Sequence, residues 1–418
     1  MTTMPTIAEL GRRAKVASRA LASAPTDARD AALLAGADLL VQHADDLLAA
    51  NAADVERAAA DGQPATVVDR LRLTRTRIEG MAGGLAQVAS LSDPVGEVTA
   101  GWVRPNGLRI RSVRVPLGVV AIIYENRPNV TSDAFGLCLK SGNAAFLRGS
   151  SGAIRSNTAI AAVLRQGLAK AGLPKDALVL VEDTSREAAV DFMRQRDTID
   201  CLIPRGGPSL IRSILDNATV PYVIDGDGNC HVYVDAAADL AMATEIVVNA
   251  KTQRPSVCNA AETLLVHEAV AAEFLPAVAA RLDGVALVGD PATRALLGEE
   301  RVGEATESDW ADEYLDLALA VRVVPSLDEA IEHITRYGSG HSEAIVTGSL
   351  AAAERFTQRV DAAAVVVNAS TRFVDGEEFG FGAEIGISTQ KLHARGPMGL
   401  RQLTTQKYVV EGDGQVRT

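Results

Sequence analysis

The chain has 418 residues, of which 47% are hydrophobic and 22% charged, so it can bury the cores of two domains and is not disordered. Its 53 acidic and 41 basic residues give a formal net charge of −12, which opposes binding to nucleic acid and to anionic membrane surfaces. The sequence has no apolar stretch of membrane-spanning length, no CxxC pair and no HExxH spacing. We therefore expect a cytoplasmic protein with reduced cysteines and no metal.

In chain order, the first predicted element is a helical segment over residues 6–91, which is rich in alanine and repeats apolar side chains at helical spacing. Residues 97–116 then alternate around a central Pro-Asn-Gly sequence and predict a hairpin. From Leu117, short β-branched runs alternate with helical runs, and a second such series starts at about Gly228. Because neighbouring parallel strands need crossover connections, each series predicts a doubly wound α/β domain.

A glycine turn joins a predicted strand to a predicted helix in CLIPRGGPSLIRSIL, residues 201–215. Free backbone N–H groups at the start of such a helix favour a bound phosphate. The turn lacks the GxGxxG pattern, however, and many crossovers in α/β domains need a glycine for geometric reasons alone. Taken by itself, this segment supports both interpretations.

Cys258 lies in NAKTQRPSVCNAAETLLV, a polar stretch between a predicted helix and a predicted strand. Lys251 and Arg254 precede it, and nearby cations stabilise a thiolate and bind an anionic leaving group. The alternative is a small buried apolar side chain, which is the better interpretation for Cys138 and Cys201 because apolar residues flank them. The spacing alone leaves both roles open for Cys258.

Six longer strings occur in a fixed order along the chain: YENRPNVTSD (124–133), IPRGG, VNAKTQRPSVCN, HITRYGSGHSEAI (333–345), VNASTR and GISTQKLHARGPMGL (386–400). Together they resemble the gamma-glutamyl phosphate reductases of the aldehyde dehydrogenase superfamily over essentially the whole length. The resemblance implies an aldehyde dehydrogenase-like α/β fold with two doubly wound α/β domains, a helical N-terminal segment and a small β oligomerisation arm.

The resemblance also implies a domain order. It places an NADP-binding domain at residues 1–227 with a hairpin arm inserted at 99–115, a catalytic domain with the nucleophilic cysteine at 228–385, and a C-terminal oligomerisation segment at 386–418. An exposed hairpin leaves unpaired strand edges, which a second subunit can cover. We therefore expect a homo-oligomer, at least a dimer.

For the cofactor, the resemblance implies contacts at the end of one strand. Arg148, followed by Gly149, stands where aldehyde dehydrogenases have a lysine on the cofactor ribose. Ser151 stands where NAD-selective relatives often have a glutamate that repels a 2′-phosphate. A neutral hydroxyl beside an arginine accommodates that phosphate, which favours NADPH/NADP+.

Two further cofactor contacts follow from the resemblance. The turn with Gly206, Gly207 and Ser209 falls where the family holds the pyrophosphate. Glu313 resembles the glutamate that accepts a hydrogen bond from the nicotinamide-side ribose. Without the resemblance, Glu313 would be interpreted as a solvated surface carboxylate.

The resemblance places Cys258 at the nucleophile of the superfamily. Members that hydrolyse their thioester have a glutamate before a Gly-Gly pair, but Ile224 stands at that position here. Asp225 does not replace it, because a shift of one residue on a strand reverses the side-chain direction, and Asp227 is better suited to a turn with Gly226 and Gly228. The implied reaction is therefore NADPH-dependent reduction of L-glutamyl 5-phosphate to L-glutamate 5-semialdehyde and phosphate, the second step of proline synthesis from glutamate.

The remaining assignments concern the oxyanion donor and the residues that bind the phosphate and the substrate carboxylate. Asn129 is the predicted side-chain donor to the oxyanion, with a turn role as the alternative. Lys251 and Arg254 are expected to hold the phosphate, and Arg127 or Arg372 the substrate carboxylate, although surface arginines usually have no such role.

Two other functions compete with this one. The first is an NADP-dependent dehydrogenase that hydrolytically oxidises a free aldehyde, which Ile224 argues against. The second is a non-catalytic nucleotide-binding protein, which the retained Cys258 loop argues against. A glutamate kinase that makes the unstable acyl phosphate is a candidate partner.

Overall fold

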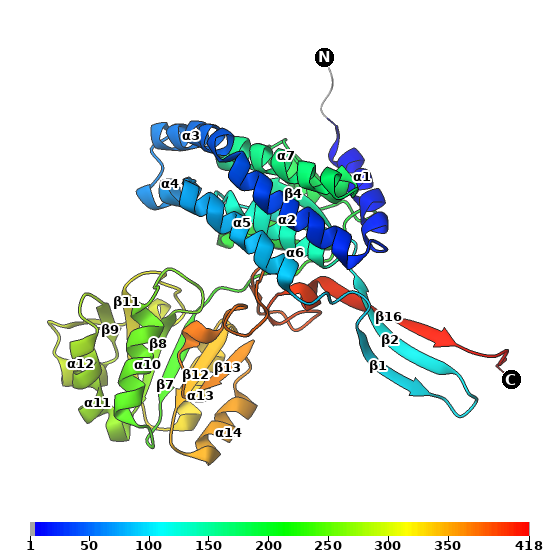
Figure 1. Cartoon of the computed structure of the whole chain (residues 1–418). Helices are drawn as coiled ribbons and strands as arrows, with labels where there is room; N and C mark the ends of the chain where they lie inside the picture. The colour runs from blue at the N-terminus through cyan, green and yellow to red at the C-terminus, as the bar shows by residue number, and fades with distance from the viewer. Residues whose placement is uncertain (1–4, 418) are drawn as a thin grey trace. The chain divides into compact units, whose positions relative to one another are not determined.

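The computed structural model describes residues 5–417 and divides them into two compact units (Figure 1). The first unit runs to Ile224 and also contains Phe381–Gly386 and the chain from Met398 onward. The second unit comprises Asp225–Gly380 and Ile387–Pro397. The C-terminal segment, treated above as one piece, is thus shared between the two units.

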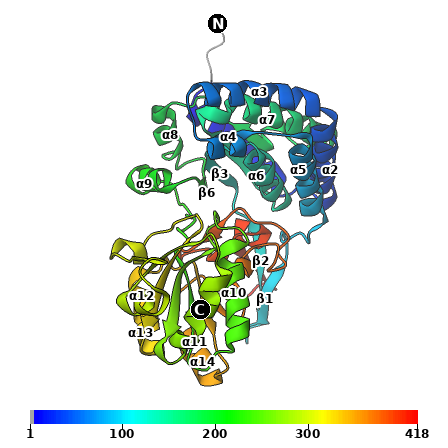
Figure 2. The same ribbon diagram turned by 90° about the vertical axis from the view of Figure 1, so that its left-hand side faces the viewer.

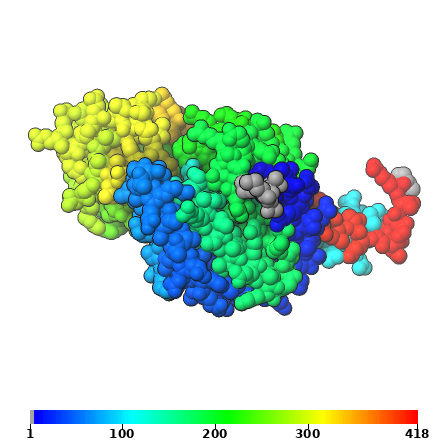
Figure 3. All heavy atoms as spheres, turned by 90° about the horizontal axis from the view of Figure 1, so that it is seen from above, coloured from blue at the N-terminus to red at the C-terminus, as the bar shows by residue number. Residues whose placement is uncertain are grey.

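The first unit begins with helices, as the alanine-rich periodicity predicts. They are α1 (Ile7–Leu21), α2 (Thr26–Gln42), α3 (Ala44–Ala60), α4 (Ala65–Leu71) and α5 (Arg75–Ser90). A capping box starts α1, since the Thr6 side chain accepts from the Glu9 N–H while the Glu9 carboxylate accepts from the Thr6 N–H. Helix α2 packs along α5 and α7, and α3 also packs along α7, so the helical segment covers one face of this unit (Figure 3).

A parallel four-stranded sheet forms the centre of the first unit, in the order β5-β4-β3-β6. The strands are β3 (Val119–Tyr124), β4 (Ala144–Gly149), β5 (Leu178–Leu180) and β6 (Cys201–Arg205). The connecting helices are α6 (Asn129–Lys140), η1 (Ser151–Ala153), α7 (Ile154–Lys170), η2 (Lys175–Ala177), α8 (Arg186–Phe192) and α9 (Pro208–Asn217) (Figure 2). Tyr124 is in register with Gly149 and Arg205, so the loops that follow three strands meet at one edge.

An antiparallel arm projects from the first unit (Figure 1). It consists of β1 (Val98–Val103), β2 (Arg109–Pro116) and, after η5 (Leu400–Leu403), β16 (Thr404–Glu411). The hairpin prediction is confirmed, and the C-terminal strand pairs with β2 from Thr404 opposite Pro116 to Glu411 opposite Arg109.

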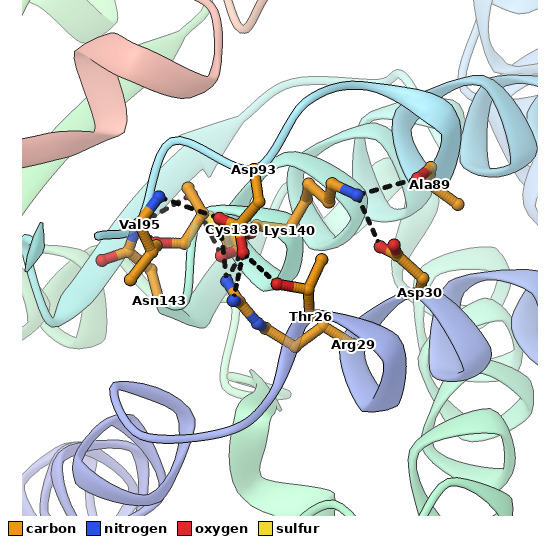
Figure 4. Close-up of polar contacts among 10 residues, drawn as sticks. Thr26, Arg29, Asp30, Ala89, Asp93, Val95, Cys138, Lys140 and Asn143 are labelled. Carbon is orange, nitrogen blue, oxygen red and sulfur yellow. Dashed lines mark hydrogen bonds and ion pairs between the residues drawn. The ribbon is translucent and has the colours of Figure 1, made fainter. Parts of the chain in front are cut away.

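Two buried cations connect α2 with α6 and with the segment that leads into the arm (Figure 4). Arg29 donates to the Asp93 carboxylate at 2.5 Å and to the Lys140 carbonyl. The Lys140 Nζ in turn lies 2.6 Å from an Asp30 oxygen and donates to the Ala89 carbonyl. Removing one partner of such a pair would leave an uncompensated buried charge, so these contacts fix the root of the arm.

The second unit contains a parallel seven-stranded sheet in the order β10-β9-β11-β8-β7-β12-β13. Its strands are β7 (Cys230–Val234), β8 (Ala261–His267), β9 (Ala286–Gly289), β10 (Val302–Glu304), β11 (Ala318–Val324), β12 (Ser342–Val346) and β13 (Ala364–Val367). Its helices are α10 (Leu240–Thr252), α11 (Glu268–Arg281), α12 (Pro291–Leu297), η3 (Ser308–Trp310), α13 (Leu327–Tyr337), α14 (Leu350–Arg359) and η4 (Thr371–Phe373). A short antiparallel pair, β14 (Ile387–Ser388) and β15 (Gly396–Pro397), completes it.

The second sheet has apolar side chains packed on both faces, as a doubly wound sheet requires. One face includes Val232 and Leu264, and the other includes Tyr233 and Leu265, so successive residues of a strand enter opposite cores. Within residues 5–417, none of the helices combines the length and the apolar character needed to cross a bilayer.

Candidate active site

Cys258 lies in the loop that joins α10 to β8 in the second unit. Its side chain is half-buried, whereas Cys138, Cys201 and Cys230 are buried. Burial raises the pKa of Cys201 to about 12 and also raises that of Cys138, so both thiols stay protonated in the core. The prediction that Cys138 and Cys201 are core residues is confirmed, and Cys258 is the cysteine that solvent can reach.

The backbone of Cys258 is held against the start of β7. A Cβ added at Gly228 would lie 1.8 Å from the Cys258 carbonyl oxygen, so only glycine allows this approach. The Cys230 thiol donates to the same carbonyl at 3.1 Å. Sequence reasoning missed both contacts, because residues about 30 positions apart share no local pattern. The Gly-Asp-Gly sequence at 226–228 was the available signal.

Glu313 contacts the same point from another loop. Its carboxylate accepts the Gly228 N–H at 2.7 Å. Burial raises the pKa of Glu313, the hydrogen bond from Gly228 opposes this rise, and the charge of Asp227 adds to it. The structure therefore brings Glu313 and Cys258 together through Gly228.

Two arginines accompany Cys258. Arg254 is exposed in the same loop, and the half-buried Arg372 donates from Nε to the Gln253 side chain at 2.8 Å. Burial lowers the pKa of Arg372, the charge of Arg254 lowers it further, and Cys258 acts in the opposite direction. Arg372 thus interacts electrostatically with both Arg254 and Cys258, and such cations suit a thiolate and an anionic substrate.

Lys251 occupies a different environment from Arg254. Its side chain is fully buried, with Nζ 2.5 Å from a Glu262 carboxylate oxygen that is itself buried. A lysine already paired in the core cannot also present its charge at the surface of the loop. The structure therefore does not support the expectation that Lys251 contacts the phosphate, and Arg254 and Arg372 are the better placed cations.

In the first unit, Arg148 is the second-last residue of β4, and its side chain is buried. It donates to the Thr184 and Ser185 carbonyls at 2.9 and 2.7 Å. Burial lowers the pKa of Arg148, and the charge of Asp183 opposes this. Position 149 requires glycine, because a Cβ there would lie 2.1 Å from the Asn157 amide nitrogen. Ser151 is exposed at the start of η1. Arg148 and Ser151 therefore lie at one strand end, as an adenosine-side cofactor site requires.

The glycine turn leads into α9, whose first residue is Pro208. Gly206 and Ser209 are exposed, and a Cβ at Gly206 would lie 2.7 Å from the Leu210 side chain. The Glu125 carboxylate accepts the Gly207 N–H at 3.1 Å. A helix start that already binds one anionic group has the donors and partial charge that a phosphate needs.

The loop after β3 contains a further asparagine, Asn126, three residues before the predicted donor Asn129. Asn126 has φ +25°, and its Oδ1 accepts the Ser150 hydroxyl at 2.7 Å. This contact fixes the amide so that its N–H groups point away from Ser150, and backbone strain of this kind clusters at functional sites. Asn129 is exposed and donates to Asp133 at 2.8 Å, within the first turn of α6.

The remaining predicted positions are accessible. Arg127 is exposed in the loop between β3 and α6, Ile224 is half-buried, and Asp227 is exposed. Asp225 pairs through its backbone with Ser388, at the start of the second unit. No carboxylate stands at position 224 itself.

Comparison with known proteins identifies the family. The model of the aldehyde dehydrogenase family matches residues 2–298. The gamma-glutamyl phosphate reductase of Clostridium beijerinckii is 56% identical over 409 residues, 97% of this chain and 98% of that protein. The one from Moorella thermoacetica is 59% identical over 409 residues, 97% of each. The chain belongs to the gamma-glutamyl phosphate reductases.

Solved structures agree with this family assignment. The crystal structure of the gamma-glutamyl phosphate reductase from Thermotoga maritima has a TM-score of 0.97 at 48% identity, covering 99% of this chain and 100% of that one. An acetylating aldehyde dehydrogenase from Geobacillus thermoglucosidasius, at 19% identity and a TM-score of 0.69, shares the fold. The predicted family and the aldehyde dehydrogenase-like α/β fold are confirmed.

Proposed function

We propose that this gamma-glutamyl phosphate reductase converts L-glutamyl 5-phosphate to L-glutamate 5-semialdehyde and phosphate, with Cys258 as the nucleophile. The observation that supports this most directly is the half-buried Cys258 thiol beside Arg254 and Arg372. A thiolate attacks the acyl carbon, the bond from that carbon to the phosphate oxygen breaks, and a thioester on Cys258 results. Arg254 and Arg372 neutralise the departing phosphate and the substrate carboxylate.

The first unit fits NADPH. Arg148 and Ser151 would hold the adenosine ribose and its 2′-phosphate, and the N–H groups at Gly206, Gly207 and Ser209 would hold the pyrophosphate. The resemblance assigns the second ribose to Glu313, which belongs to the second unit. NADPH supplies the hydride for reduction when it is bound. The side chain of Glu125 would leave the Gly207 N–H as the phosphate takes its place.

Hydrogen-bond donors of the chain itself stabilise the negative charge that develops on the acyl oxygen. We infer that the Cys258 backbone N–H donates to this oxygen. The predicted side-chain donor is Asn129, and Asn126, whose amide oxygen accepts from Ser150, is an alternative in the first unit. When the carbon–sulfur bond breaks, Cys258 leaves as a thiolate, which the neighbouring arginines stabilise. Asn129 is the weaker candidate because Asp133 engages its amide.

In the reverse reaction, inorganic phosphate attacks the thioester, and water does not. Ile224 provides no carboxylate to activate water, which separates this enzyme from hydrolytic aldehyde dehydrogenases. The test is the reverse reaction with glutamate 5-semialdehyde and NADP+, in which NADPH formation should require inorganic phosphate. Equal rates without phosphate would refute the proposal in favour of hydrolysis.

Other parts of the function concern partners and location. The outer edges of β1 and β16 are unpaired within the described arm, and Trp102, Val103 and Tyr408 on it are exposed, so a second copy of the chain could cover them. Light scattering of the purified enzyme should show a dimer or a larger homo-oligomer. The four cysteines form no disulfide with one another, which suits the cytoplasm, where a glutamate kinase could deliver the unstable acyl phosphate.

A further inference from the structure

The buried ion pair between Lys251 and Glu262 lies next to the active-site loop and has no place in the reaction described so far. Lys251 is near the end of α10, Glu262 is the second residue of β8, and both side chains are fully buried. Burial lowers the pKa of Lys251 and raises that of Glu262, while each charge opposes the shift in the other. Replacing either side chain would leave the other charge buried without a partner, which is unfavourable, so the two side chains stay paired in the folded protein.

The pair also supports a loop. The second carboxylate oxygen of Glu262 accepts the Leu315 N–H at 3.2 Å. Leu315 has φ +53°, a left-handed conformation that costs a branched residue free energy and persists where the surroundings impose it. Its side chain is 42% exposed, so packing of that side chain in the core does not explain the conformation.

The loop in question carries Glu313, two residues before Leu315. The Glu313 carboxylate accepts the Gly228 N–H, and Gly228 rests against the Cys258 backbone. A chain of contacts therefore runs from Lys251 through Glu262 and Leu315 to Glu313. Electrostatics follow the same route, since the charge of Glu313 raises the pKa of Glu262 and the charge of Lys251 lowers the pKa of both carboxyl groups.

We propose that Lys251 is a positioning residue: through Glu262 and the Leu315 N–H it holds residues 312–316 so that the Glu313 carboxylate faces the cofactor, and it does not touch the phosphate. The proposal rests on the function proposed above, in which Glu313 holds the nicotinamide-side ribose. It assigns Lys251 to cofactor affinity and leaves phosphate affinity to Arg254 and Arg372.

The test uses the full-length enzyme and separates the two affinities. Lys251→Met should raise the Kd for NADPH, measured by its fluorescence without substrate, by about tenfold, the value of one charge-assisted hydrogen bond. The KM for phosphate in the reverse reaction should stay within about twofold of the parent, a change near the error of such measurements. The double variant Lys251→Met with Glu262→Gln keeps an acceptor for Leu315 without a buried charge, and it should restore most of the NADPH affinity.

Lys140→Met is the matched control, because Lys140 is also a buried lysine paired with a carboxylate, Asp30, in the first unit. It should lower the melting temperature as Lys251→Met does and leave NADPH affinity unchanged. If Lys251→Met does not fold, Glu262→Gln alone should also raise the Kd for NADPH by about threefold or more, because it leaves the Lys251 charge buried without a partner, and the double variant should reverse that rise.

Two results would overturn the positioning role. A phosphate KM raised by about tenfold or more with unchanged NADPH affinity would make Lys251 a phosphate ligand. Lower thermal stability with both affinities unchanged would make the pair purely structural. A parent enzyme that lacks phosphate-dependent NADP+ reduction would instead refute the proposed function, so the parent is measured first.

Discussion

The two units use different means to prepare their parts of the chemistry. In the first unit, the predicted cofactor site consists largely of backbone: glycines, strand ends and the start of α9, with Arg148 as the main charge. In the second, loops that are distant in the sequence meet at the backbone of Cys258, and the buried Lys251–Glu262 pair lies at the end of the same loop. Backbone sites depend on fold geometry, whereas side-chain sites depend on packing and on charges in the core. Single substitutions should therefore affect the two units differently.

Replacing the nucleophile should have the largest effect. Cys258→Ala should lower activity by a factor on the order of 10⁴ or more, because the covalent step is lost, while NADPH binding and the melting temperature stay near those of the parent. Steady-state assays and fluorescence titration measure both. Substantial phosphate-dependent activity in this variant would show that hydride reaches a bound acyl phosphate directly.

The core cysteines provide the contrast to this result. Cys138→Ala and Cys201→Ala should each cost roughly 1 kcal/mol of stability through lost packing and leave turnover nearly intact. Thermal melts and the same assays would test this. A variant at either position that loses turnover without losing stability would contradict the distinction between core and catalytic thiols.

The loop after β3 tests the oxyanion assignment. Asn126→Gly, which suits the φ of +25° and removes the amide, should lower kcat by roughly 10²-fold, the usual loss of one oxyanion donor. Asn129→Ala should have little effect on kcat, because its amide serves Asp133. The opposite ranking would restore Asn129 as the donor predicted from the sequence.

These two asparagines also show where prediction from the sequence stops. The helical segment, the hairpin and the alternation of strands and helices follow from local periodicity, which depends on neighbours three or four residues away. The Asn126 conformation depends on Ser150, and the Lys251 pair depends on Glu262 in the core, so neither has a local signal. Lys251 and Arg254 look equivalent in the sequence, yet Lys251 is buried and Arg254 is exposed, so their environments differ.

The cofactor site should respond to a single charge in the first unit. Ser151→Glu places a carboxylate where the 2′-phosphate is expected, so the ratio of kcat/KM for NADPH over NADH should fall by about tenfold or more. Ser151→Gln is the matched neutral control and should change the ratio much less. An unchanged ratio in the glutamate variant would mean that Ser151 lies away from the phosphate.

Acid should affect the second unit before the first, because His333 and His341 are buried there. Burial lowers the pKa of His333 to about 2, with the charges of His231 and the nearby arginines adding to the effect, and that of His341 to about 4. Both pKa values lie below the unfolded value of about 6.5, so below that pH the unfolded chain binds more protons and folding stability is lost. As the pH falls below about 6.5, each histidine should lower the free energy of unfolding by up to about 1.4 kcal/mol per pH unit. For His341 this loss should continue down to about pH 4, and for His333 to a lower pH.

His333→Gln tests this, since glutamine keeps an acceptor for Arg322, which donates to the His333 ring at 2.8 Å. Between pH 7.5 and 5.5 the variant should lose less free energy of unfolding than the parent, by roughly one histidine's share, about 1.4 kcal/mol. Hydrogen exchange resolved along the chain should show the lost protection in residues 225–380. Equal pH dependence of parent and variant, or earlier loss of protection in the first unit, would show that these histidines do not set the acid stability of the fold.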